Sequence, residues 1–126
     1  MTDRATFDAA LLDLLAAVEE VEIETRLDPT APSHRVIIWV VVDGGELFVR
    51  SVRGTRGRWY REIRSNPLGA LHAEGAIIPV RAVPAADDPS IARCSRALAR
   101  KYAGDPSLGY MLEPDVLETT LRLAPA

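Results

Sequence analysis

The chain has 126 residues, of which 48% are hydrophobic and 26% are charged, and its formal net charge is -3. A chain of this length can bury roughly two-thirds of its unfolded surface, so we expect one globular domain spanning residues 1–126. Its single cysteine excludes an intrachain disulfide and a cysteine-rich metal site, and no apolar run reaches the roughly 18 residues that a membrane-spanning helix needs. We therefore expect a cytoplasmic protein without a metal site.

The N-terminal third predicts one helix followed by strands. Apolar residues recur at helical spacing over residues 4–18, which predicts an amphipathic helix with Asp3 as its N-cap. Residues 21–26 alternate between apolar and polar side chains, as in a half-buried strand. Residues 36–42 form a continuous β-branched and aromatic run, which predicts a central strand that is buried on both faces.

The middle of the chain predicts two hairpins separated by a short helix. The glycines within residues 43–46 suit a tight turn, so residues 47–52 should return antiparallel to the strand before them. Residues 58–65 can form a short helix that ends before Asn66-Pro67, because the residue before a proline is disfavoured in the α region. Residues 68–72 and 77–83 predict two further strands.

The C-terminal part predicts a long helix and a last strand. Pro79 suggests that the strand before this helix lies at a sheet edge or contains a bulge. The helix should begin at the capping acid Asp88, which a proline follows, and end near Gly104. Residues 116–123 predict the closing strand. Hairpin-connected strands with few helices indicate an α+β domain built on an antiparallel sheet or small barrel.

Positive charge is concentrated in residues 50–64. This segment holds six arginines and one acid, giving +5, which leaves -8 on the other 111 residues. Its first eleven residues, RSVRGTRGRWY, interleave arginines with glycines, hydroxyls and aromatic rings. Glycines let backbone N–H groups approach a phosphate, hydroxyls donate hydrogen bonds, and the arginine fork pairs with phosphate oxygens. The segment predicts an anion-binding loop; the alternative is a solvated, arginine-rich surface loop.

These residues resemble the split β-barrel flavin-binding superfamily, the group of pyridoxamine-phosphate-oxidase-like and deazaflavin-dependent reductase proteins, and are closest to one of its uncharacterised branches. The resemblance covers about residues 20–123, and its most specific piece is FVRSVRG at 48–54 followed by RWY at 58–60. It implies a six-stranded antiparallel split barrel with an N-terminal helix and one long late helix. It also implies a homodimer with flavin mononucleotide (FMN) or a deazaflavin between the subunits.

The resemblance further implies which residues hold the cofactor. Phosphate contacts map onto a strand end and the loop after it, the strand around Trp39 flanks the flavin ring, and Arg35 corresponds to a basic position of the family. Trp59 either stacks on the ring or plugs the barrel end. The expected cofactor-binding residues are Arg35, Trp39, Arg50, Ser51, Arg53, Gly54, Arg56, Arg58 and Trp59. No catalytic residue is assigned, because neither His34 nor His72 carries a motif that pairs it with a nucleophile, and Cys94 fits a helix's apolar stripe.

The expected function is an oxidoreductase that transfers a hydride between the cofactor and a small unsaturated or quinone-like substrate. The cofactor performs the redox step, so the lack of a catalytic triad is no objection. One alternative is a split barrel that binds a flavin, haem or another anion without turnover. It is favoured because residues 28–34, DPTAPSH, replace the Ser-Gly-Arg or Ser-Gly-Lys turn of many relatives. Another is a nucleic-acid module that stacks bases on Trp59 and Tyr60, against which the net negative charge argues.

Overall fold

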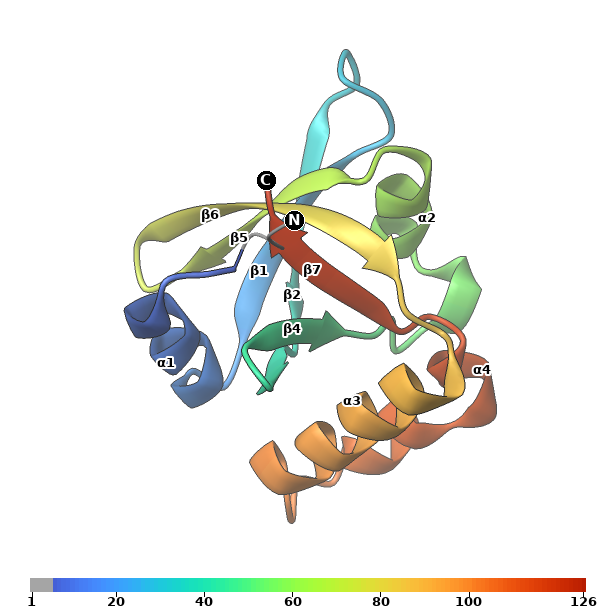
Figure 1. Cartoon of the computed structure of the whole chain (residues 1–126). Coiled ribbons are helices and arrows are strands. Elements are labelled where there is room, and N and C mark those ends of the chain that lie inside the picture. Colours follow the sequence, from blue (N-terminus) through green and yellow to red (C-terminus); the bar gives the residue numbers. More distant parts are fainter. Residues whose placement is uncertain (1–5) are drawn as a thin grey trace, which may run out of the picture.

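A computed structural model describes residues 6–126 and confirms an α+β fold. Seven strands form one antiparallel sheet in the order β2-β1-β5-β6-β7-β4-β3, which curls into a split barrel (Figure 1). The strands are β1 (Val21–Arg26), β2 (Ser33–Ile38), β3 (Val41–Asp43), β4 (Glu46–Val49), β5 (Leu68–Ala73), β6 (Ala76–Pro84) and β7 (Leu121–Pro125). The helices are α1 (Ala9–Ala17), α2 (Arg58–Ser65), α3 (Asp88–Lys101) and α4 (Pro114–Leu117), with the short 3₁₀ helices η1 (Gly54–Arg56) and η2 (Leu108–Leu112).

The apolar run at residues 36–42 is not the central, doubly buried strand that its composition predicts. It divides into the end of β2 and the start of β3, and these two strands are the opposite edges of the sheet. On β2, Val36 and Ile37 are 39% and 59% exposed. The chain passes from one edge to the other through Trp39-Val40, so the described residues contain seven strands where six were expected.

Both predicted hairpins are present. Gly44 and Gly45 have φ values of +57° and +79°, the positive values that a two-residue turn needs to match the twist of its strands, and they join β3 to β4. Between the two hairpins, α2 has its predicted bounds and ends before Pro67. The second hairpin joins β5 to β6 through Glu74 and Gly75, which also have positive φ.

The prediction that Pro79 places its strand at an edge or in a bulge is wrong, because β6 pairs with β5 on one side and β7 on the other, and the register with β5 is unbroken through Pro79. The carbonyl of Pro79 accepts a hydrogen bond from the N–H of Ala126, the last residue of the chain. The nitrogen and the carbonyl of one strand residue point to the same side. The missing N–H of Pro79 therefore faces the end of β7, where the sheet loses little pairing.

Several element boundaries differ from the predicted ones, and β4 ends at Val49 although a strand was predicted through residue 52. Helix α1 begins at Ala9, because the Asp8 carboxylate accepts from the N–H of the second helical residue; the predicted cap, Asp3, lies outside the described residues. Helix α3 is capped by Asp87, one residue before the predicted cap. Residues 116–120 are not extended. Pro114 starts the single turn α4, and the two threonines after it donate back to carbonyls of that turn.

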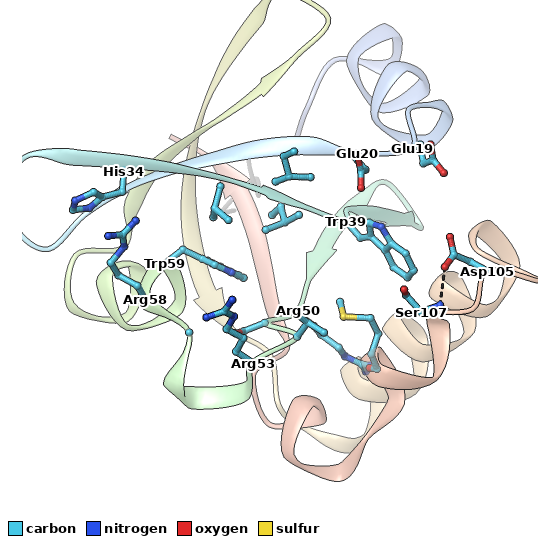
Figure 2. Close-up of a pocket in the computed structure, with 17 residues that line it drawn as sticks. Glu19, Glu20, His34, Trp39, Arg50, Arg53, Arg58, Trp59, Asp105 and Ser107 are labelled. Carbon is cyan, nitrogen blue, oxygen red and sulfur yellow. Dashed lines mark hydrogen bonds between the residues drawn. The ribbon is translucent and has the colours of Figure 1, made fainter.

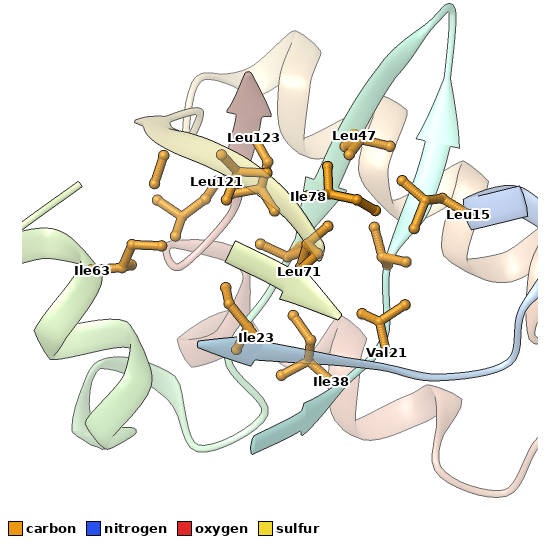
Figure 3. Close-up of a cluster of buried hydrophobic side chains, with 14 of the residues drawn as sticks. Leu15, Val21, Ile23, Ile38, Leu47, Ile63, Leu71, Ile78, Leu121 and Leu123 are labelled. Atoms are coloured by element: carbon orange, nitrogen blue, oxygen red, sulfur yellow. The ribbon is translucent and has the colours of Figure 1, made fainter. Parts of the chain in front are cut away.

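Two apolar clusters stabilise this arrangement. The larger fills the barrel, where Ile23, Leu71 and Leu123 point toward one another (Figure 3). Trp59 belongs to this cluster and is 8% exposed. The smaller cluster lies between α3 and the β3–β4 hairpin and contains Cys94, which is buried as its place on the apolar stripe predicts. Within residues 6–126, no helix combines the length and apolar character that crossing a bilayer requires.

Candidate functional site

A pocket of about 710 Å³ lies between the edge strand β2 and the segment that follows β4. One wall consists of β2 and Trp39, the other of residues 50–53 and the start of α2, and the segment around η2 closes one end (Figure 2). Pockets of a few hundred to a thousand Å³ are the usual size for small-molecule and cofactor sites. The pocket is therefore large enough for a cofactor-sized ligand.

Six of the nine cofactor-binding residues expected from the sequence line this pocket, and three do not. The lining residues among them are Trp39, Arg50, Ser51, Arg53, Arg58 and Trp59. Arg35 instead pairs with Glu22 on the neighbouring strand. Gly54 adopts a φ of +65° to turn the chain into η1, and Arg56 is exposed outside the pocket.

Arg50 lies in the pocket wall, but its guanidinium is engaged inside the protein. The side chain is 1% exposed and donates to the hydroxyls of Thr120 and Ser95 and to the carbonyls of Met111 and Ile91, at 2.9–3.0 Å. Burial lowers the pKa of this guanidinium. Arg50 therefore joins the end of β4 to η2, α3 and the residue before β7, and these internal contacts engage all three of its guanidinium nitrogens.

Ser51 and Gly57 form a tight corner at the N-terminus of α2. Ser51 Oγ is the buried side-chain polar atom that has no hydrogen-bond partner within residues 6–126. A Cβ added at Gly57 would lie 2.5 Å from this oxygen, so only glycine fits there without a shift. Gly57 is the N-cap of α2, and the helix has no side-chain cap and no acid in its first turn. The free N–H groups of such a helix start favour a negatively charged ligand.

The pocket has a cationic end and an acidic end. Arg53 and Arg58 line the first and form no hydrogen bond or ion pair with any residue in the described part of the chain. Glu19, Glu20 and Asp105 line the other end, and Figure 2 shows the arginines near Trp59 and the acids near Trp39. A ligand with one anionic group should therefore bind with that group beside the arginines.

Trp39 is held in the pocket wall by an aromatic stack. Its ring lies 3.8 Å from that of Tyr102 with an interplanar angle of 6°. The Tyr102 hydroxyl donates to the carbonyl of Glu19 at 2.7 Å, and this hydrogen bond fixes the position of the tyrosine ring. The indole plane is thus fixed between the two ends of the pocket, where a flat ligand ring can pack against it.

Sequence reasoning missed a polar pair at the cationic end. His34 lines the pocket, and its Nδ1 lies 3.0 Å from Oε2 of Glu62, a carboxylate that is 7% exposed. The sequence pattern assigns no role to His34, because it stands at the end of a predicted loop. The signal in the sequence was Glu62 itself, the single acid among six arginines in residues 50–64.

Comparison with solved structures finds the same fold in proteins whose names refer to F420, pyridoxamine 5'-phosphate or haem. One is an F420-H2-dependent reductase (TM-score 0.64, 15% identity, 84% of this chain and 93% of that chain). The second is a putative pyridoxamine 5'-phosphate oxidase from Listeria innocua (TM-score 0.61, 14% identity, 93% of this chain and 90% of that chain). The third is HutZ, the haem storage protein of Vibrio cholerae (TM-score 0.65, 15% identity, 96% of this chain and 91% of that chain). At these identities the likeness shows the split-barrel fold alone.

No curated protein matches the sequence. A family model does, and it spans residues 11–123, nearly the whole chain. The chain therefore belongs to the family described as "Uncharacterized protein conserved in bacteria (DUF2255)".

Proposed function

We propose that the pocket binds FMN or a deazaflavin and that the protein transfers a hydride between this cofactor and a small unsaturated or quinone-like substrate. The observation that carries the proposal is the group of unpartnered hydrogen-bond donors at the N-terminus of α2. There, the unpartnered Ser51 hydroxyl, the close approach at Gly57 and two unpaired arginines lie at one end of a pocket with an aromatic wall. The structural likeness to a reductase and an oxidase supports the same function.

The residues present fit a phosphate-bearing flavin. Arg53 and Arg58 would pair with the phosphate oxygens, and the first N–H groups of α2 and Ser51 Oγ would supply further donors. Trp39 and Ile38 would flank the ring system. The bound cofactor would supply the redox chemistry, while the protein binds it, orients it and shields it from water.

The charges of the pocket select one orientation of such a ligand. The carboxylates of Glu19, Glu20 and Asp105 repel a phosphate, whereas the arginine end attracts it. Arg53, Arg58 and the start of α2 would therefore hold the phosphate, and Trp39 would flank the ring.

We further propose that the protein is a homodimer. Val36 and Ile37 on the edge strand β2, together with Val52, are exposed and line the pocket rim. The outer side of β2 has no strand paired to it in the described chain. Exposed apolar side chains beside an unpaired edge favour association with another surface. A second copy placed there would cover the open side of the pocket.

The second candidate is a protein that binds its ligand without turnover. Its supporting observation is the acidic end of the pocket, where Glu19 and Glu20 are exposed to solvent. Hydride-transfer sites generally exclude water from the reacting atoms. The likeness to the haem storage protein HutZ also fits this candidate.

One experiment separates these candidates. The purified protein is titrated with FMN and with a deazaflavin while cofactor fluorescence is followed, and reduction of a soluble quinone by the reduced cofactor is then timed with and without protein. The proposal expects saturable binding and a rate above that of the free cofactor. Binding without acceleration would favour the second candidate, and absence of binding to either cofactor would overturn the proposal.

A further inference from the structure

A polar cluster that the proposed cofactor contacts do not use lies at the cationic end of the pocket. Thr25 on β1 stands opposite His34 on β2 in the strand register. The Thr25 hydroxyl donates to Glu62 Oε1 at 2.8 Å, and the two carboxylate oxygens of Glu62 lie 3.2 and 3.0 Å from His34 Nδ1. A buried carboxylate on α2 therefore fixes the histidine ring against the sheet.

This contact determines what the other ring nitrogen can do. An ionised carboxylate only accepts hydrogen bonds, so when Glu62 is ionised the hydrogen of this contact is on Nδ1 of His34. Nε2 has no partner within residues 6–126, and the ring lines the pocket. The free nitrogen is thus an acceptor when the ring is neutral and an N–H donor when the ring is protonated.

The cluster lies next to one of the two unpaired arginines. Arg58 and Glu62 are four residues apart on α2, which places them on the same face of the helix. Figure 2 shows the Arg58 guanidinium and the His34 ring at the same end of the pocket. The charged groups that face His34 from α2 are Glu62 and Arg58, while β1 contributes the uncharged Thr25. His34 is therefore placed to contact an anion that Arg58 holds.

We propose that His34 is a third ligand of the anionic group and binds it only when its imidazole is protonated. The inference rests on the proposed anion site. In the protonated ring, Nδ1–H stays with Glu62 and Nε2–H donates to the anion; in the neutral ring, the Nε2 lone pair faces the anion and repels it. Glu62 is the positioning residue, because it fixes the ring and compensates its charge.

The consequence is an anion site whose affinity depends on pH. Histidine changes charge between roughly pH 5 and 8, whereas Arg53 and Arg58 stay charged throughout this range. Loss of one charge-assisted hydrogen bond corresponds to about a tenfold or greater loss of affinity. Anion affinity should therefore fall by about that factor as pH rises through this range.

Inorganic sulfate is the suitable probe, because its charge does not change in this range, whereas a phosphate monoester loses its second proton near pH 6. Sulfate is titrated at pH 5.5 and at pH 8 while the backbone amide signals of Ser51 and Gly57 are followed by NMR. The test variant is His34→Asn, whose amide retains a donor toward Glu62. The matched control is His72→Asn, because His72 contacts a different glutamate, Glu24, and lies outside the pocket.

The unmodified protein and His72→Asn should bind sulfate about tenfold or more weakly at pH 8 than at pH 5.5. His34→Asn should bind with the weaker affinity at both pH values. A full pH response in His34→Asn, or none in the unmodified protein, would overturn this inference and leave the anion site in place. Absence of sulfate binding at both pH values would overturn the anion site as well. If His34→Asn does not fold, the Nε2 resonance of His34 is followed in the unmodified protein at pH 5.5. The inference requires that sulfate shift this resonance, and an unshifted resonance would overturn it.

Discussion

Arg50 and Arg53 stand three positions apart in the same arginine-rich segment and have opposite environments. Arg50 is buried and donates to four acceptors, which come from residues 41 to 70 positions away in the sequence. Arg53 is exposed in the pocket and has no partner in the described chain. The residue types of this segment predict an anion-binding loop. They could not separate a structural arginine from a ligand-facing one, because distant elements supply the acceptors.

Replacing Arg50 should therefore affect stability first. Arg50→Met has a similar length but leaves buried hydroxyl and carbonyl oxygens without a donor, so we expect the free energy of unfolding to fall by about 3 kcal/mol or more. Urea denaturation followed by circular dichroism measures this change. Arg53→Met is the control and should change stability by less than about 0.5 kcal/mol. Equal effects of the two substitutions would contradict the assigned roles.

Replacing Ser51 should lower ligand affinity and leave stability unchanged. Its hydroxyl has no partner in the described chain, so Ser51→Ala removes no internal hydrogen bond of that oxygen and should leave the unfolding midpoint unchanged. The same substitution removes a donor from the proposed phosphate site, and affinity for FMN should fall about tenfold. Denaturation and fluorescence titration of the same sample measure both quantities. A loss of stability with unchanged FMN affinity would show that the hydroxyl is structural.

At the scale of elements, the turn glycines and Pro67 predicted well, whereas Pro79 and the continuous apolar run at residues 36–42 predicted poorly. Gly44 and Gly45 and the proline after α2 restrict only the backbone next to them. The sequence therefore predicts the hairpin turn and the helix end at these residues without knowledge of the rest of the fold. The run at residues 36–42 has the composition of a central strand. In this curled sheet, however, the segment that crosses from one edge to the other also buries apolar side chains, those of Ile38 and Val40. Composition alone therefore cannot distinguish a central strand from such a crossing segment.

Lys101 connects α3 to α1 and to the segment between β2 and β3, and its titration makes stability depend on pH. From the end of α3, its Nζ donates to the carbonyls of Leu15 in α1 and Val40 in the crossing segment, at 2.9 and 2.7 Å. Burial lowers the pKa of Lys101 from 10.5 to about 8. The folded protein thus releases this proton at lower pH than the unfolded chain does. The free energy of unfolding should rise from about pH 8 to pH 9.

The comparison with Lys101→Met isolates this contribution. Cys94 and the other groups that titrate above pH 8 are present in both proteins, so the difference between the two stability profiles belongs to Lys101. Urea denaturation at pH 7, 8 and 9 measures the profiles. The unmodified protein should gain stability relative to Lys101→Met as pH rises. A constant difference across this range would contradict the lowered pKa.

At the scale of the whole molecule, the sequence resemblance predicted the split barrel and the likeness to solved structures shows it. The shape of the pocket could not be predicted, because its walls combine the edge of the sheet, the loop after β4 and the segment around η2. These parts are separated by tens of residues and meet only in the folded chain. The uneven charge of the sequence was nevertheless informative: Arg53 and Arg58 of its basic segment line one end of the pocket, while Glu19, Glu20 and Asp105 line the other.

The proposed dimer can be tested at the exposed edge. Ile37→Asp places a charge on β2 at the pocket rim, and we expect it to convert a dimer into a monomer because a buried, unpaired charge is costly. Sedimentation velocity at micromolar concentration measures the mass. Ile77→Asp is the control, since Ile77 is similarly exposed, at 66%, but lies on β6 outside the pocket. A monomeric unmodified protein, or dissociation by both substitutions, would contradict this interface.

The binding of FMN compared with riboflavin, which lacks the phosphate, tests the anion site most directly. Dissociation constants of both ligands are measured by fluorescence for the unmodified protein, for Arg53→Ala/Arg58→Ala, and for Arg96→Ala, which removes an exposed arginine of α3 that has no partner in the described chain. The unmodified protein and Arg96→Ala should prefer FMN by about 100-fold, as expected for two charge-assisted contacts, and the double variant should lose this preference. Equal affinity of the unmodified protein for both ligands, or an undiminished preference in the double variant, would contradict a phosphate site at the start of α2.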